Sequence, residues 1–203
     1  DEISVNAFSD GGMSKVHNIA DLPSAMIATG VVQANGVGDF NATELKKVLT
    51  GKIASVNTYI STYEEGIGGN SSIKDFETML QLMYLYFTQP RKDDNSFTAL
   101  MNMYRTSLAN AEKNPNKAFS DSISLTTSNH DPRSIIQNLK MVDQINQDKA
   151  LQIYKQRFAN PADFTFVFVG NIDPNDKNTQ SLLKTYLGGL KTDKKQLEKY
   201  DNV

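Results

Sequence analysis

The segment from residue 73 to residue 87 constrains the fold most, because its apolar side chains occupy nearly the whole circumference of a helix. Ser72 and Asp75 are typical of a helix start, and Pro90 is typical of the region just after a helix end. A helix without a polar face must lie in a core or between two layers. The chain has 203 residues, which suffices for one sizeable domain that buries such a helix.

Three further segments follow strand patterns. Residues 3–7 alternate apolar and polar side chains, which predicts a half-buried strand that ends at a turn beginning with Asp10. Residues 52–67 are rich in Ile, Val, Thr and Tyr and predict a hairpin, and the glycines of residues 66–69 predict a turn. Residues 164–169 (FTFVFV) carry the strongest strand signal and predict a strand buried on both faces.

Capping and breaking residues predict the remaining helices. Asp21 with Pro23 marks one start, Asn41 with Glu44 forms a capping pair, and Asn146 marks another start. The predicted helices are residues 22–32, 42–49, 97–112, part of 118–140, a segment after Asn146, and a short segment around 182–186 that ends at Gly188-Gly189. Strands, a hairpin and long helices in this order predict an α+β fold, with helices covering a mainly antiparallel sheet.

We expect residues 1–190 to form a single domain without internal repeats. Residues 191–203 are polar and Lys-rich, which predicts a linker toward a following domain. The sequence begins with Asp1 and shows no signal-peptide pattern. We therefore expect the chain to be part of a longer polypeptide.

The composition excludes several classes of protein. The 21 basic and 23 acidic side chains give a net charge of -2, which argues against a nucleic-acid partner, since such binding needs clustered Lys and Arg. No stretch approaches the roughly 20 apolar residues that span a bilayer, so we expect no membrane partner. Cysteine is absent, which excludes disulfides, thiolate nucleophiles and Cys-type zinc sites.

Histidine, the residue that supplies most zinc ligands, is scarce in this sequence. The chain has only His17 and His130. They are far apart in the sequence, and neither has the His, Glu or Asp residues at helical spacing that would complete the three protein ligands of a catalytic zinc. No G-x-S-x-G motif marks a nucleophilic serine. The sequence therefore predicts no catalytic, cofactor-binding or metal-binding residue in this chain.

Neither the carboxylate pairs nor the glycine-rich loops of the sequence predict a functional site. The pairs are Glu64 with Glu65, Asp93 with Asp94, and Asp75 with Glu77, and we expect all of them to be solvated charges, since such residues are usually exposed. Residues 36–41 contain two glycines of a dinucleotide-binding motif but not the third, and they follow a helix rather than a strand. A loop between two helices is the prediction there.

Three ordered runs carry a family resemblance. They are SSIKDFETMLQLMYLYFTQPRKD (residues 71–93), RFANPADFTFVFVGNID (residues 157–173) and TYLGGL (residues 185–190). Together they resemble the pitrilysin/insulinase family of zinc peptidases, the inverzincins, most closely its bacterial members. The resemblance implies a two-layer sandwich like that of LuxS and pitrilysin, and one of four related domains whose two halves close into a chamber.

The family motif H-x-x-E-H supplies two zinc ligands and the glutamate that activates water, and a glutamate on a later helix completes the ligands. The approximate equivalents here are Ile27, Gly30 and Val31, with Thr106 and Ser107 near the last ligand. Residues 21–39 contain no His or Glu at all. In the family, the following domain supplies an Arg and a Tyr, seven residues apart, that help to hold the substrate, and no such pair occurs in this sequence. The resemblance therefore implies the non-catalytic domain that begins the second half.

The resemblance thus implies a structural wall domain of a zinc metalloendopeptidase that degrades peptides or unfolded proteins. The zinc would lie in the catalytic domain of the parent protein. The implied partners are the other domains of the same polypeptide and the peptide substrate in the closed chamber, and the implied location is the periplasm or cell envelope. An alternative is a scaffold or peptide-binding domain of a parent without peptidase activity, and a weaker one is a free-standing module that binds peptides at a sheet edge.

Overall fold

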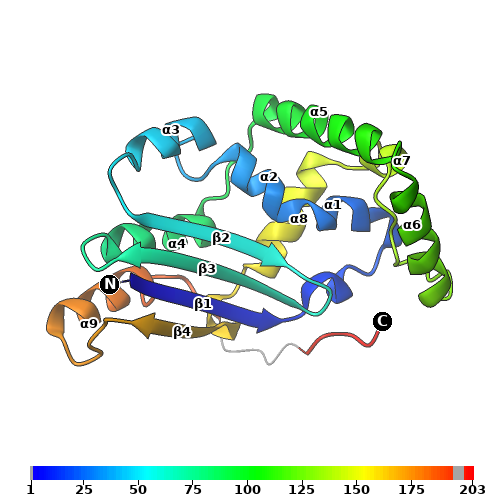
Figure 1. Ribbon diagram of the computed structural model, residues 1–203. Coiled ribbons are helices and arrows are strands. Elements are labelled where there is room, and N and C mark those ends of the chain that lie inside the picture. Colours follow the sequence, from blue (N-terminus) through cyan, green and yellow to red (C-terminus); the bar gives the residue numbers. More distant parts are fainter. Residues whose placement is uncertain (1, 194–198) are drawn as a thin grey trace.

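The computed structural model describes residues 2–193 and 199–203. Figure 1 shows a sheet with helices behind it and a helical extension on one side. The strands are β1 (Glu2–Asp10), β2 (Ala54–Ile60), β3 (Glu64–Ser72) and β4 (Thr165–Gly170). The α-helices are α1 (Leu22–Met26), α2 (Ala28–Asn35), α3 (Ala42–Val48), α4 (Phe76–Thr88), α5 (Asp94–Ala111), α6 (Pro115–Thr127), α7 (Leu139–Val142), α8 (Gln147–Arg157) and α9 (Lys177–Tyr186), and the short 3-10 helices are η1 (Gly12–Lys15), η2 (Ile19–Asp21) and η3 (Pro161–Asp163).

The sheet is antiparallel throughout its described strands, in the order β2-β3-β1-β4. Helices α2, α4 and α8 lie on one face (Figure 1). The alternation predicted for residues 3–7 is confirmed, since Ile3, Val5 and Ala7 point to the helices and are buried. The α+β fold is therefore confirmed.

Helix α4 supplies much of the core, as its apolar circumference predicts. Met79, Leu80 and Met83 are fully buried. The helix begins at Phe76, later than predicted, because residues 72–75 form a turn in which the Asp75 N–H donates to Ser72 Oγ at 3.1 Å. At the C-terminal end of α4, an aromatic cluster joins this helix to α8 and to the start of β4. Its rings belong to Phe87, Tyr154, Phe158 and Phe164.

The single helix predicted for residues 22–32 is wrong in one respect, because the helix is interrupted at Ile27. This residue ends α1 and precedes α2, with φ -109° and ψ 5°, away from helical values. The two pieces pack differently: Leu22 and Ala25 of α1 contact a small cluster with Ile153, whereas Val31 of α2 lies in the main core. The interruption lets each short helix bury its own apolar side.

The prediction that residues 164–169 are buried on both faces is also wrong. β4 is an edge strand, and Val167 and Val169 are 44% and 66% exposed. Only the side chains that point to the helices, Phe166 and Phe168, pack against the core. An apolar run does not reveal whether both faces of its sheet will be covered, because that depends on where the other layers lie.

The turn predicted at residues 66–69 is wrong as well, because β3 runs through all of these residues. Close packing explains two of the three glycines, Gly66 and Gly69. A Cβ on Gly66 would lie 2.4 Å from the Tyr59 ring, and one on Gly69 would lie 3.1 Å from Met79. Glycine in a strand often marks such a close approach.

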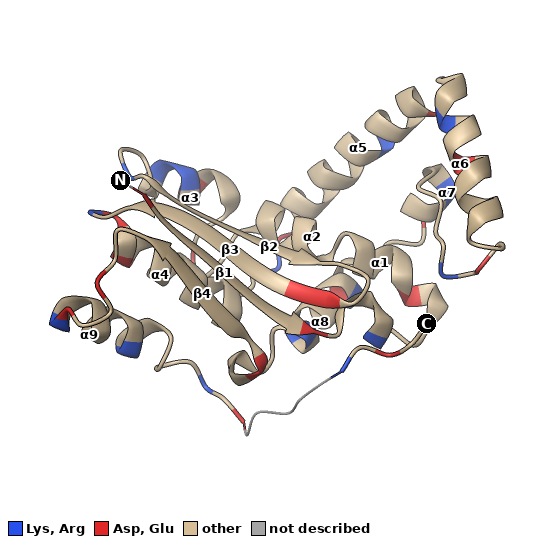
Figure 2. Ribbon diagram, turned by 60° about the horizontal axis from the view of Figure 1, so that its bottom comes forward, with Lys and Arg blue, Asp and Glu red and all other residues tan. Residues whose placement is uncertain are grey.

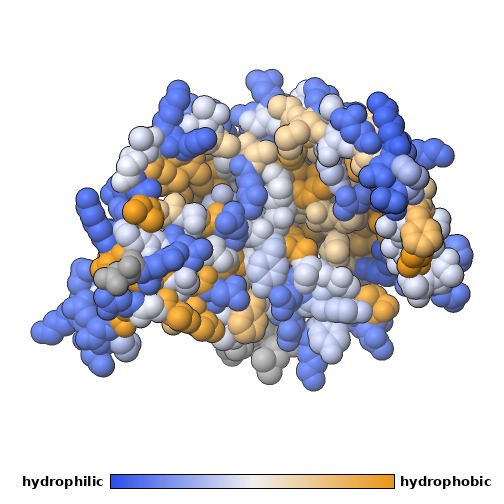
Figure 3. All heavy atoms as spheres, viewed as in Figure 1, coloured by the Kyte–Doolittle hydropathy of each residue, from blue (hydrophilic) through white to orange (hydrophobic). Residues whose placement is uncertain are grey.

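Helix α6 extends away from the body together with the end of α5 (Figure 2). None of its residues is buried, and Phe119 and Ile123 are 69% and 47% exposed. They give α6 an apolar patch that is visible at the right-hand side of Figure 3. No helix in the described part of the chain is long and apolar enough to cross a membrane.

Residues 199–203 lie beside η1. Lys15 Nζ donates to Asp201 at 3.0 Å, the Asp201 N–H donates to Ser14 Oγ at 3.1 Å, and the rings of Tyr63 and Tyr200 are 5.1 Å apart. Of the linker predicted for residues 191–203, residues 194–198 lie outside the described residues. The linker role stays a prediction.

Candidate functional site

The positions that would carry a peptidase motif hold apolar packing instead. Ile27 sits at the junction of α1 and α2 and contacts two hydrophobic clusters. Val31 is fully buried in the main core, and Gly30 has open space where a Cβ would be. On α5, Thr106 and Ser107 are exposed. None of these side chains can bind zinc in the way that the histidines and glutamates of the motif do.

The two histidines lie on separate elements. His17 is exposed and its Nδ1 lies 3.8 Å from Asp201 Oδ2. His130 follows the end of α6 with a φ of 55°, and its backbone N–H donates to the Leu125 carbonyl. Within residues 2–193 and 199–203, no three His, Cys, Asp or Glu side chains gather into a group that could bind a metal ion.

The carboxylates predicted to be solvated are partly structural, so that prediction is wrong for two of them. Glu65 is 2% exposed. It accepts a hydrogen bond from the Gly12 N–H at 2.5 Å, and Arg157 lies 3.8 Å away. A buried carboxylate needs such partners. Glu65 therefore fastens the loop after β1 to β3 and α8.

Asp75 is the second buried carboxylate. It accepts hydrogen bonds from the Ile53 N–H and from Ser72 Oγ, both at 2.9 Å. These bonds hold the pKa of Asp75 below its ordinary value, the backbone bond from Ile53 contributing most. In the same way, the Ser96 N–H at 2.8 Å lowers the pKa of Asp93, which caps α5. These groups stabilise helix ends and strands, whereas Glu77 and Asp94 are exposed.

The glycine-rich residues 36–41 form the predicted loop between helices α2 and α3. Gly36 has a φ of 86°, and a Cβ there would lie 2.1 Å from the Phe40 carbonyl oxygen. Glycine is needed for this turn rather than for approach to a phosphate. The capping box between Asn41 and Glu44 then starts α3, as predicted.

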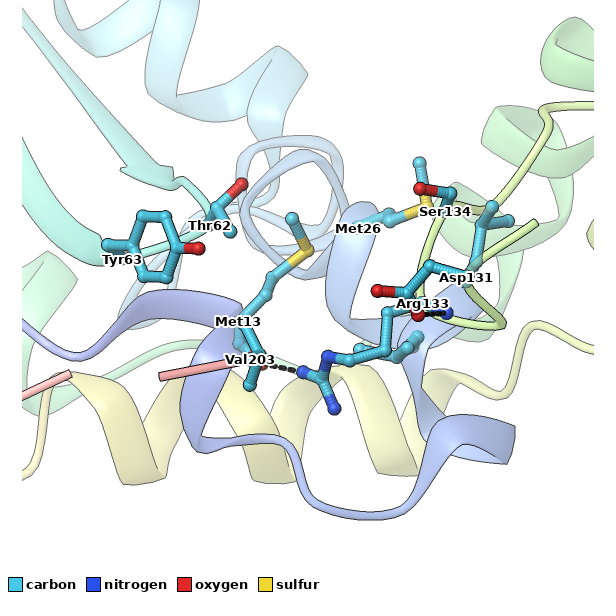
Figure 4. A pocket seen from close by; sticks show the side chains of 10 residues that line it. Met13, Met26, Thr62, Tyr63, Asp131, Arg133, Ser134 and Val203 are labelled. Atoms are coloured by element: carbon cyan, nitrogen blue, oxygen red, sulfur yellow. Dashed lines mark hydrogen bonds between the residues drawn. The ribbon is translucent and has the colours of Figure 1, made fainter. Parts of the chain in front are cut away.

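A hollow of about 390 Å³ lies where η1, α1, the β2–β3 turn and residues 131–135 meet. In Figure 4 the Arg133 side chain crosses toward Met13. Its guanidinium donates to the Met13 and Val16 carbonyls at 2.7 and 3.1 Å, and the Arg133 N–H donates to Asp131 at 2.8 Å. The hollow's charged groups thus hold loops together, and no hydrogen bond among its described lining residues pairs a nucleophile with a base.

The other extended feature is the outer face of the sheet, which sequence reasoning missed. We use this name for the side chains that point away from the helices on all four strands. Away from the strand ends they align in three rows across the sheet: Ser55, Asn70, Ser4 and Val169; Asn57, Gly68, Asn6 and Val167; Tyr59, Gly66, Phe8 and Thr165. The polar members of the alternation at residues 3–7 were the available signal.

Charged side chains on the outer face stand only at strand ends. The four strands contain no Lys or Arg, and their acidic residues are Glu2, Asp10, Glu64 and the inward-pointing Glu65. Figure 2 shows the middle of the strands free of red and blue. Burial, with a 3.0 Å hydrogen bond to Glu64, raises the pKa of Tyr59 to about 12, so this hydroxyl is neutral.

No protein-family model matches the chain. It is 27% identical over 172 residues to a protein of Escherichia coli K12 described as "Probable zinc protease PqqL", a match that covers 81% of this chain. It is also 31% identical over 122 residues to "Zinc protease PQQL-like" of Arabidopsis thaliana, which covers 58% of this chain. The matches span only 17% and 12% of the lengths of these relatives.

Solved structures show the same fold. The periplasmic protease PqqL from Escherichia coli superposes with a TM-score of 0.78 and 22% identity, covering 98% of this chain and 22% of that one. A peptidase M16 inactive domain from Pseudomonas fluorescens gives a TM-score of 0.72 at 13% identity, covering 98% of this chain and 48% of that one. The chain is therefore homologous to part of the zinc protease PqqL and has the fold of the pitrilysin-like M16 peptidase domains.

Proposed function

We propose that this chain is a non-catalytic wall domain of a zinc metalloendopeptidase, from the half of the parent protein that lacks the zinc motif. The observation that carries the proposal is the apolar packing at Ile27 and Val31, in a chain homologous to a zinc protease. A homologue that fills the motif positions with core residues retains the fold without the chemistry.

In this proposal the chain's own residues supply a rigid surface. The core formed by α4, α8 and the sheet fixes the outer face of the sheet in position. The zinc, and the glutamate that activates water, lie in another domain of the parent protein. Its substrates are peptides or unfolded proteins enclosed between the domains, and its compartment is the periplasm, as in the Escherichia coli relative.

Metal content and peptide cleavage by the purified 203-residue chain test the proposal. After equilibration with zinc and dialysis, elemental analysis is expected to find no stoichiometric zinc, and an unfolded, fluorescently labelled casein is expected to stay intact. The longer polypeptide that contains the chain serves as the positive control. Chelator-sensitive cleavage by the isolated chain, with one zinc per molecule, would overturn the proposal.

The rival function is a scaffold or peptide-binding domain of a parent with no peptidase activity. The two differ in the rest of the polypeptide: an H-x-x-E-H helix upstream supports the peptidase, and its absence supports the scaffold. The assay on the longer polypeptide gives the same answer by activity. Fractionation of the source cells, with the chain detected by antibody, tests the periplasmic location.

A further inference from the structure

The outer face of the sheet is unusual for a surface exposed to water. Sheets with one solvated face commonly place charged and polar side chains there. Here the three rows hold hydroxyl, amide, glycine and apolar side chains, and charges stand only at the strand ends. We propose that the outer face of the sheet binds extended, uncharged polypeptide segments, mainly through their main chain.

The asparagine side chains in the three rows can recognise a polypeptide main chain. An amide side chain both donates and accepts hydrogen bonds, as a peptide group does. Asn6 and Asn57 are exposed and make no side-chain hydrogen bond within the described residues, so both are available. In the next row, Ser4 Oγ donates to Asn70 Oδ1 at 2.7 Å, which leaves the Asn70 amide nitrogen to donate elsewhere.

Gly68 makes room for a bound chain between these amides. It pairs with Asn6 on β1 and with Asn57 on β2. A Cβ on Gly68 would lie no closer than 3.7 Å to any neighbouring atom, so neither packing nor a positive φ requires glycine there. At Gly66, by contrast, the Tyr59 ring fills the space above the strand. The missing side chain at Gly68 leaves a shallow trough with an amide on each side.

The absence of charged side chains from the three rows favours an uncharged ligand. A charged segment would lose solvation on this face without meeting a counter-ion, which is costly. An uncharged main chain exchanges its hydrogen bonds with water for bonds to Asn and Ser side chains. The exposed Val167 and Val169 on β4, together with Phe8, border the polar rows and can contact apolar side chains of the bound segment. Unfolded segments low in charge fit this surface best.

This inference rests on the proposed function for its biological setting, where unfolded substrate lies against the domain, but its test does not. The isotope-labelled 203-residue chain is titrated with a blocked, uncharged peptide of Ser, Asn, Gly and Val, and with the same peptide carrying alternating Lys and Glu. The uncharged peptide is expected to shift the side-chain amide signals of Asn6 and Asn57 saturably, and the charged peptide to bind at least about tenfold more weakly.

Two variants test the site itself. Gly68→Val fills the trough at a strand position that favours a β-branched side chain, and Asn6→Lys adds a charge at an exposed position. Each is expected to weaken binding at least about tenfold while leaving the melting temperature near that of the parent chain. Asn116→Lys on α6 is the matched control and is expected to bind normally.

Three outcomes would overturn the inference: no saturable binding of the uncharged peptide, full binding by both sheet variants, or shifts confined to the free backbone edges of β2 and β4, which would indicate strand addition. Failure of the proposed function is separate, because it appears as zinc binding or hydrolysis by the isolated chain, whatever the peptide titration gives.

Discussion

The aromatic cluster around α8 and the helix α6 are held in place by different forces. In the cluster, Tyr154 and Phe158 stack with ring centroids 4.5 Å apart, and the Tyr154 hydroxyl donates to the Tyr86 carbonyl at 3.0 Å. In α6 no residue is buried, and Phe119 is 69% exposed. One region is stabilised by packing, and the other by its own backbone hydrogen bonds.

The side-chain hydrogen bonds and the ion pair of α6 are all local within the described residues. Asn114 caps its first turn, and Lys117 pairs with Asp121. Isolated helices of this length are marginal in water, and the Ser and Thr residues of α6 are only moderate helix formers. The comparison of α6 with the cluster around α8 shows that helices of one domain can differ widely in their local stability.

Hydrogen exchange should show the largest contrast between the two regions. Amides in the middle of α4 and α8 are expected to exchange only on global unfolding, with an opening free energy of about 5–15 kcal/mol. Amides of α6 are expected to exchange with an opening free energy near zero, by local fraying. Exchange followed by NMR or mass spectrometry gives both values. Equal protection in α6 and α8 would contradict the comparison.

Truncating one ring in each region should give the next largest difference. Phe158 is 2% exposed, so Phe158→Ala is expected to lower the free energy of unfolding by about 3–5 kcal/mol. Phe119→Ala is the matched control, and its change is expected within about 0.5 kcal/mol, as for surface substitutions. Denaturant titration of both variants measures this. Comparable losses would mean that α6 is packed in solution.

Acid dependence should give the smallest effect. Because the folded pKa of Asp75 is lowered, its stabilising effect is present above the unfolded pKa of about 4 and is lost as the pH falls through the folded value. Asp75→Asn is expected to destabilise the chain at neutral pH and less so at acidic pH. Asp121→Asn, in the local i,i+4 pair on α6, is the control and should change little at either pH. Denaturant titrations at both pH values decide, and an Asp75→Asn deficit that does not shrink in acid would contradict the expectation.

Local signals in the sequence located most of the elements. The apolar circumference of residues 73–87 indicated α4, and the capping residues Asn41 and Asn146 marked the starts of α3 and α8. These signals work because each depends on a few neighbouring residues. The four strands followed from the alternation of residues 3–7, the hairpin pattern of residues 52–67 and the apolar run of residues 164–169.

What could not be predicted depends on distant parts of the chain. The edge position of β4 is set by the strand order, and Gly66 and Gly69 of β3 are explained by Tyr59 and Met79 from other elements. The buried role of Glu65 depends on Arg157 of α8 and the loop after β1. The outer face needed the register of all four strands, so only two of its residues, Ser4 and Asn6, were visible as a pattern.

The interruption at Ile27 has a consequence for how a catalytic centre is lost. In the family's motif, a helix holds two histidines a turn apart on the same side, where both can bind one ion. Here the first of those places falls on a joint with φ -109° and ψ 5°, and the second, Val31, is buried in the core. An imidazole at Ile27 would stand at the N-cap of α2 rather than inside a helix, and one at Val31 would be buried among apolar side chains. Restoring the centre would therefore require repacking this segment as well as substituting residues.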